Sequence, residues 1–191
     1  MVFQARSYGR ELLKGQRSLL KIFDITTGEQ RTVLNADYLL EAPNWTPDGK
    51  TLVFNAGGQL CKIDVSGDVG AELIPTEPLS NLNNDHVLSP DGKSIYVSSN
   101  DGHLYNVTID GGTPIRVSNV HNEPFHYFLH GVSPDGQELA FVAIEGTGDA
   151  VRRNIFTIPT SGGDDKRLTD ITQPNDGPEY SPDGKWIYFN S

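Results

Sequence analysis

The sequence has little of what several classes of protein depend on, beginning with cysteine. The 191-residue chain has one cysteine, Cys61, which excludes an internal disulfide and a cysteine-rich zinc site. Lys and Arg number 15 against 25 Asp and Glu, for a formal net charge of -10, and no segment concentrates the basic residues. Nucleic acid and anionic membrane surfaces are therefore not expected partners.

Long apolar runs are also missing. The first twenty residues intersperse Arg6, Arg10, Lys14 and Arg17 with short apolar groups, and they do not form the apolar stretch of a secretory signal. No segment approaches the length of a membrane-spanning helix. The sequence as written predicts a soluble cytoplasmic protein without membrane insertion, or a periplasmic one if a signal peptide has been removed.

Common catalytic and cofactor motifs are absent as well. There is no Gly-x-Ser-x-Gly nucleophile elbow and no Walker-type Gly-Lys motif, and Gly146-x-Gly148 lacks the third glycine of a dinucleotide fingerprint. We therefore assign no catalytic residue and expect no organic cofactor. A divalent metal ion stays possible.

What the sequence does have is a repeated tetrapeptide, Ser/Thr-Pro-Asp-Gly. Its prolines are separated by 43, 44 and 48 residues, and the four copies are Thr46 to Gly49, Ser89 to Gly92, Ser133 to Gly136 and Ser181 to Gly184. Proline, aspartate and glycine in this order suit a hairpin turn, and the interval suits one four-stranded propeller blade.

An apolar strand follows each turn. The third and fifth residues after each glycine predict a core of Leu52, Phe54, Ile95, Val97, Leu139, Phe141, Ile187 and Phe189. The residues between them are also largely apolar, so both faces of these strands are expected to be buried between stacked blades. Third strands are predicted over Leu60 to Asp64, Leu104 to Thr108 and Asn154 to Ile158, and fourth strands over Ala71 to Ile74, Pro114 to Val117 and Lys166 to Leu168. A longer hairpin loop over Glu145 to Asp149 accounts for the 48-residue spacing.

These repeats predict an all-β fold, a β-propeller of four-stranded antiparallel blades with about four blades' worth of strands in a single domain over residues 1–191. The Ser-Pro-Asp-Gly-Lys turn, the apolar strand after it and endings such as Gly162 to Thr169 resemble the repeats of TolB-like propellers, a WD-type architecture, from about Leu19 onward. The resemblance implies a ring of six blades. The chain is therefore either a four-bladed ring or a partial propeller, and the sequence leaves both open.

The two ends of the pattern are complementary. The chain begins with a third and a fourth strand, Leu19 to Asp24 and Gln30 to Leu34, and ends with a first and a second strand. Because unpaired sheet edges invite aggregation, we expect Leu19 to Asp24 to pair antiparallel with Trp186 to Asn190 in a folded monomer.

Polar residues gather before the turns, where the innermost strand of each blade lines the central channel. His86 and His130 lie four residues before a motif proline, and Glu41, Asn84 and Asp176 lie six before one, with Asp85 beside them. Residues two apart share a strand face, so these side chains are candidates for a ligand site at the channel mouth, with His86 and His130 as metal ligands. The alternative is that they hydrogen-bond strand ends and water.

Two classes of function remain. The first is a non-catalytic platform that binds a protein or a small ligand at the channel mouth, as the resemblance to TolB, which interacts with an envelope system, implies. The alternative is a metal-dependent propeller enzyme, a lyase or hydrolase of a small or saccharide substrate, by resemblance to oligogalacturonate lyase propellers, which place histidine ligands before comparable turns. The family's full ligand set is not matched here.

Overall fold

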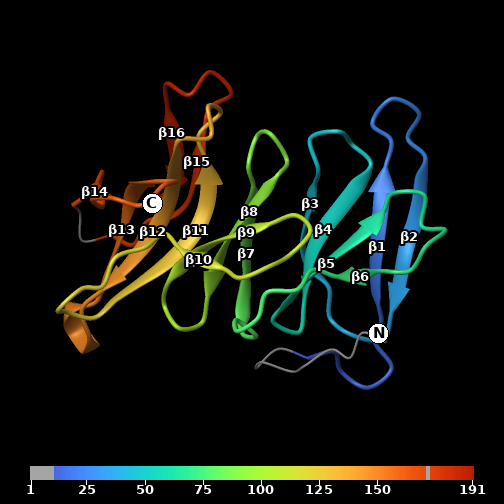
Figure 1. Ribbon diagram of the computed structural model, residues 1–191, viewed down its shortest axis with the longest axis horizontal. Helices are drawn as coiled ribbons and strands as arrows, with labels where there is room; N and C mark the ends of the chain where they lie inside the picture. Colours follow the sequence, from blue (N-terminus) through green and yellow to red (C-terminus); the bar gives the residue numbers. More distant parts are fainter. Residues whose placement is uncertain (1–10, 171–172) are drawn as a thin grey trace.

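The structure is a computed structural model that describes residues 11–170 and 173–191. In these ranges the chain forms sixteen strands in five antiparallel sheets, three of four strands and two of two strands (Figure 1). The one helix in the described ranges, η1 (Gly148–Ala150), has three residues, so none is long enough to cross a membrane. The all-β class predicted from the repeats is confirmed.

Each four-stranded sheet is one propeller blade with its strands in chain order. The first blade has β3 (Glu41–Trp45), β4 (Thr51–Ala56), β5 (Gln59–Asp64) and β6 (Glu72–Leu73). The second has β7 (Leu82–Leu88), β8 (Ser94–Ser99), β9 (Leu104–Thr108) and β10 (Ile115–Arg116). The third has β11 (Phe125–Val132), β12 (Glu138–Glu145), β13 (Arg152–Pro159) and β14 (Lys166–Arg167). The predicted third and fourth strands and the long loop before β13 all agree.

The repeated tetrapeptide forms the turn between the first two strands of each blade. In the second copy the Ser89 hydroxyl donates to Asp91 Oδ1 over 2.6 Å, and the Lys93 amide donates to the same oxygen over 3.1 Å. Gly92 has a φ of 70° and donates its amide to the Ser89 carbonyl over 2.9 Å. Glycine accepts this left-handed conformation without strain, so the motif is a device for closing a turn.

The hydrophobic core lies between neighbouring blades. Second-strand residues of the three complete blades are buried on both faces, as predicted: Leu52, Val53, Phe54, Ile95, Tyr96, Val97, Leu139, Ala140 and Phe141. The prediction is wrong for the last copy, where Ile187 is half-buried and Phe189 is exposed. The reason is that β16 (Ile187–Asn190) pairs with β15 (Asp176–Tyr180) alone, so no third strand covers it.

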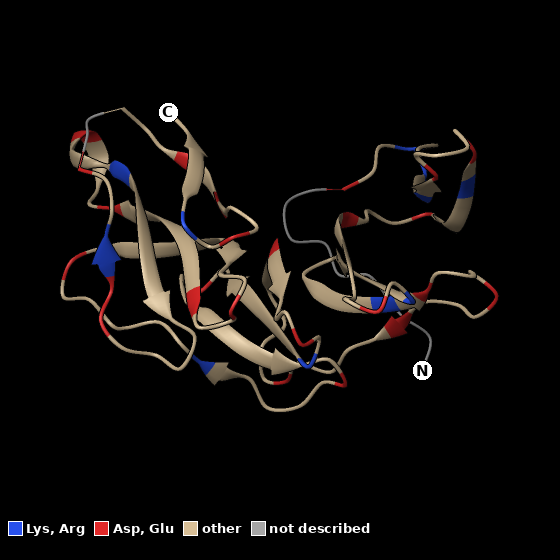
Figure 2. Cartoon of the chain, turned by 90° about the horizontal axis from the view of Figure 1, so that it is seen from above, with Lys and Arg blue, Asp and Glu red and all other residues tan. Residues whose placement is uncertain are grey.

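The predicted closure of the ring is also wrong. At the other end of the chain β1 (Ser18–Phe23) pairs with β2 (Gln30–Ala36) and with no other described strand. The sheets follow one another along an arc, and the two end sheets stay apart on it (Figures 1 and 2). The angle between blades is set by the packing of whole faces, and at this angle the described strands make a partial propeller rather than a closed ring.

Candidate ligand-binding groove

The first strands of the three complete blades, and β15, all break their register between three and eight residues before the motif proline. The interruptions fall between Glu41 and Asn44, Leu82 and His86, Leu129 and Gly131, and Asp176 and Glu179. Such bulges bend a strand and redirect its side chains, and they concentrate near binding sites. The repeated bulge therefore changes the directions in which the side chains of the first strands point, at the side of the molecule where these strands lie next to one another.

One of these bulges carries backbone strain. Ala42 has a φ of 47°, which is a left-handed conformation. In the described ranges it is the one non-glycine residue with such a conformation. The equivalent position of the last sheet, also followed by proline, is Gly177 with a φ of 62°. The left-handed conformation raises the free energy of a residue with a side chain, and backbone strain of this kind concentrates at functional sites.

A groove of about 460 Å³ runs over these bulged strands. We call it the first-strand groove; it is bordered by β3, β7 and β11 and by Glu179 of β15, and its lining includes Pro43, Asn44, Trp45, Asn84, Asp85, His86, Pro90, His130, Gly131 and Glu179. Trp45 is about half exposed. The lining includes carboxylates but no Lys or Arg, so the groove suits neutral or cationic groups better than anions.

Polar side chains fix neighbouring blades to one another beside this groove. Asn44 Nδ2 donates to the His86 carbonyl over 3.1 Å, which joins the first strands of two blades. One blade further along, the Leu129 amide donates to the buried Ser98 hydroxyl over 2.8 Å. A groove held by such bonds is preorganised, which lowers the entropic cost of binding.

His86 faces the interface between blades rather than the open groove. Its ring is buried, and Nδ1 lies 3.2 Å from the Asn84 carbonyl oxygen. Nε2 is buried near the Val53 carbonyl of the neighbouring blade but has no hydrogen-bond partner of normal geometry. Burial lowers the pKa of His86 to about 4, because the charged ring loses its hydration.

His130 has a different environment although it occupies the same repeat position. His86 pairs with Val97 in the sheet, whereas the register of β11 passes from Leu129 to Gly131 and leaves His130 outside the ladder. His130 is partly exposed, and its Nε2 lies 3.3 Å from Asp176 Oδ1. The structure thus brings His130 and Asp176 together, while in the described part of the chain the buried ring of His86 is directed towards its own strand and the neighbouring blade.

The other predicted site residues divide between two hollows. Asp85 borders the first-strand groove, where Asn83 Nδ2 donates to its carboxylate over 3.1 Å. Glu41 borders a smaller hollow of about 170 Å³, together with Asn55 and Asn100, and Asn84 borders both. Across residues 11–170 and 173–191, no three His, Cys, Asp or Glu side chains come together as metal ligands.

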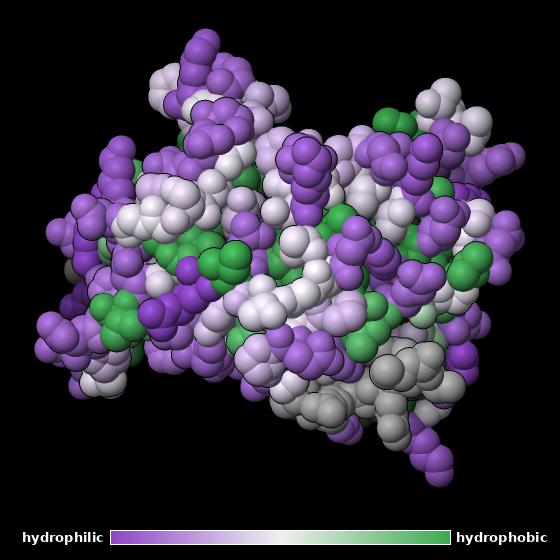
Figure 3. Space-filling model, in the orientation of Figure 1, coloured by the Kyte–Doolittle hydropathy of each residue, from purple (hydrophilic) through white to green (hydrophobic). Residues whose placement is uncertain are grey.

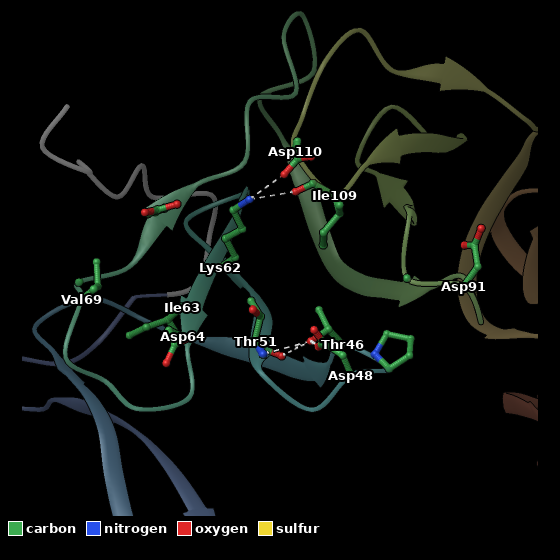
Figure 4. A pocket seen from close by; sticks show the side chains of 14 residues that line it. Thr46, Asp48, Thr51, Lys62, Ile63, Asp64, Val69, Asp91, Ile109 and Asp110 are labelled. Carbon is green, nitrogen blue, oxygen red and sulfur yellow. Dashed lines mark hydrogen bonds and ion pairs between the residues drawn. The ribbon is translucent and has the colours of Figure 1, made fainter.

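A larger cleft of about 700 Å³ lies between the first and second blades, beside their turns (Figure 4). Three of its carboxylates are already engaged: Lys62 Nζ lies 3.2 Å from Asp110, and a hydrogen bond from Thr46 lowers the pKa of Asp48, as one from Ser89 does for Asp91. Asp48 and Asp91 close the turns of their blades, and Asp110 pairs with Lys62 across the cleft, so these acids have structural roles.

A polar cluster ties the loop after β10 to the third blade. The buried Tyr127 hydroxyl donates to Asp165 Oδ2 over 2.7 Å, and His121 Nε2 lies 3.0 Å from the same oxygen. Burial raises the pKa of Tyr127, with the hydrogen bond to Asp165 adding to it. Tyr127 also packs on Phe141, with ring centroids 4.8 Å apart, so it is a packing residue of the third blade.

Residues of the groove that the sequence did not indicate are Trp45 and Glu179. A signal was present, since Pro43 and Pro178 interrupt otherwise strand-like segments, and proline within a strand marks a bulge or an edge. On the face shown in Figure 3, hydrophobic residues form several separate groups among polar ones.

The sheets, their order and their arc define the class: this is part of a β-propeller. No family model matches the chain. An uncharacterized protein of Agrobacterium fabrum is 40% identical over 179 residues, which cover 92% of this chain and 58% of that protein. The chain thus spans somewhat over half the length of this relative.

Solved structures with a similar fold include TolB-like propellers. A putative TolB from Agrobacterium tumefaciens superimposes with a TM-score of 0.80 and 38% identity, over 96% of this chain and 63% of that one. TolB from Acinetobacter baumannii gives 0.71 and 21%, over 93% and 44%. An oligogalacturonate lyase in complex with manganese gives 0.65 and 17%, over 94% and 52%, and shares the fold alone.

Proposed function

We propose that the chain is a non-catalytic binding platform and that the first-strand groove takes a peptide segment of a partner protein. The observation that carries the proposal is the repeated bulge: the first strands of three successive blades, and β15 beside them, all break register shortly before their turns and border one groove. A bulge leaves backbone groups outside the sheet ladder. Several of these groups are bonded within the protein, such as the Asp85 amide to Asn83 and the Leu129 amide to Ser98, so a bound peptide would be held mainly by the side chains and the shape of the groove.

The lining indicates the chemistry of that segment. Asp85 and Glu179 border the groove, and its lining contains no Lys or Arg. Half-exposed Trp45 offers an aromatic face, the type of residue that contributes most to protein interfaces. A peptide that combines Lys or Arg with apolar residues suits this surface. The resemblance to TolB, which interacts with an envelope system, supports a protein as partner.

Tryptophan fluorescence tests the proposal, because the chain has two tryptophans and only Trp45 borders the groove. Peptides selected from a random phage-displayed library on the immobilised chain serve as probes. In Trp186→Phe the remaining tryptophan is Trp45, and bound peptide should change its emission. In the matched variant Trp45→Phe the remaining Trp186 should report no change.

Affinity gives the second measurement. Trp45→Ala should weaken the selected peptides at least about tenfold, the effect of losing about 1.4 kcal/mol at an interface, whereas Ile115→Ala, on an exposed outer strand, should leave them unaffected. Selection of acidic peptides, or peptides that bind equally well without Trp45, would show that the groove is not the site.

The metal-dependent enzyme is a second candidate, supported by one contact, His130 Nε2 to Asp176 Oδ1 at 3.3 Å. A third ligand would have to come from His86, whose Nε2 is buried without a partner, after a rotation of its ring. Titration with Mn²⁺ by calorimetry separates the candidates. Binding that His130→Ala and His86→Ala each abolish supports a metal site, and no heat of binding to the wild type removes it.

A further inference from the structure

Two carboxylates border the first-strand groove and a third contacts one of its histidines, but their charges are compensated to different degrees. Asp85 accepts a hydrogen bond from Asn83 Nδ2 over 3.1 Å, and Asp176 Oδ1 lies 3.3 Å from His130 Nε2. The carboxylate of Glu179 makes no hydrogen bond or ion pair with the residues that the structure describes. Glu179 is therefore the acid with which an incoming cation can pair without breaking an existing contact.

The side chain of Glu179 lies against the first strand of the third blade. A Cβ atom at Gly131 would lie 3.4 Å from Glu179 Oε2 and 3.0 Å from the Pro178 carbonyl oxygen. The positions equivalent to Gly131 in the first two blades, three residues before the motif proline, are Asn44 and Val87. Because Gly131 has no side chain, the Glu179 carboxylate can lie beside β11, where it borders the groove.

The surroundings of this carboxylate favour a cationic ligand. Glu179 is accessible, but neighbouring groups remove part of its hydration, which raises the pKa of its carboxyl group. The lining of the groove holds no Lys or Arg that could compensate the charge. A partly desolvated carboxylate is stabilised in its charged form by a positive group within contact distance, and an acid of this kind in a cleft is a candidate for a functional role.

Arginine suits this position better than lysine. A guanidinium group donates two parallel hydrogen bonds to one carboxylate, and it is more weakly hydrated than an ammonium group. It therefore loses less hydration when it enters a groove that is partly closed to water. The expected order of affinity at this position is arginine, then lysine, then a neutral side chain.

We propose that Glu179 is the specificity-determining residue of the first-strand groove and that it pairs with an arginine side chain of the bound peptide. The inference rests on the proposed function, because it concerns one side chain of the peptide that the groove takes. It assigns the charge preference of the groove to a single residue. Glu179 and Trp45 then have separate roles, since Glu179 selects the charge and Trp45, which borders the same groove, contributes an aromatic contact surface.

A double-mutant cycle between the protein and the peptide tests this pairing. The probes are the peptides selected on the immobilised chain, each compared with copies in which one arginine is replaced by citrulline, which has nearly the same shape but no charge. Binding is followed by the emission of Trp45 in the Trp186→Phe background. Citrulline at the paired position should weaken binding at least about tenfold, and Glu179→Gln should weaken the arginine peptide by a similar factor. The two changes together should weaken binding no more than either alone, and lysine at this position should give an intermediate affinity.

Two variants serve as controls. Glu123→Gln removes an exposed carboxylate outside the lining of the groove and should leave all affinities unchanged. Asp85→Asn removes the other acid of the lining and should leave the preference for arginine over citrulline intact. A preference that persists in Glu179→Gln, or that Asp85→Asn removes, overturns the assignment. Selected peptides that change the emission of Trp45 but lack arginine, or bind equally well with citrulline, also overturn it and leave the proposed function standing, whereas peptides that do not change this emission overturn both.

Discussion

Acidification should weaken the fold through one buried histidine, His86. Its ring lies between two blades, and burial lowers its pKa from 6.5 to about 4. The unfolded chain keeps a value near 6.5. Between these two pKa values His86 is protonated in the unfolded state and neutral in the folded state. The free energy of unfolding therefore falls as the pH falls. Above pH 6.5 His86 makes no pH-dependent contribution.

The size of this loss of stability follows from the difference between the pKa values of His86 in the folded and unfolded states. Each pH unit between the two values costs about 1.4 kcal/mol, so lowering the pH from 7 to 5 should remove about 2 kcal/mol and lowering it to 4 about 3 kcal/mol. His103, whose pKa burial also lowers, adds a slope of the same sign. The turn aspartates, with pKa values lowered from 3.8, lose their contribution only below that range.

Urea unfolding of the wild type and of His86→Gln at pH 7, 6 and 5 measures this contribution. The difference between the two proteins cancels the groups that they share. We expect the wild type to lose about 2 kcal/mol more than the variant over this range. Parallel pH dependences would refute the reasoning, since His86 would then titrate in the folded state as it does in water, and the ring would be accessible from the groove.

Two further predictions concern packing and the bulge. Phe141→Ala should cost about 3–5 kcal/mol in urea unfolding, whereas Phe189→Ala, at the same repeat position but exposed, should cost under about 1 kcal/mol in the single chain; equal costs would contradict the assignment of the half-blade. Ala42→Gly should raise the free energy of unfolding by about 0.5–1 kcal/mol, because relief of the left-handed strain exceeds the added freedom of the unfolded chain, and the matched change Gly177→Ala should lower it. A neutral pair would mean that neither position is strained.

Local features of the fold could be predicted from the sequence, and the closure of the ring could not. The turn motif and the period-two strands act within about ten residues, and they place β4, β8 and β12 correctly. Whether β1 meets β16 depends on the angle between blades, summed along the whole arc. That angle results from many side chains packed between faces, such as Phe54, and no short pattern records it.

The candidate site was predictable by strand but not by side-chain direction. His86 and His130 have equal spacing from their turns, yet the bulge of β7 ends at His86 while that of β11 falls on His130. One ring is therefore buried between blades, and the other reaches Asp176. A shift of one residue moves a side chain to the other face of a strand, and repeat spacing alone does not reveal where each bulge falls.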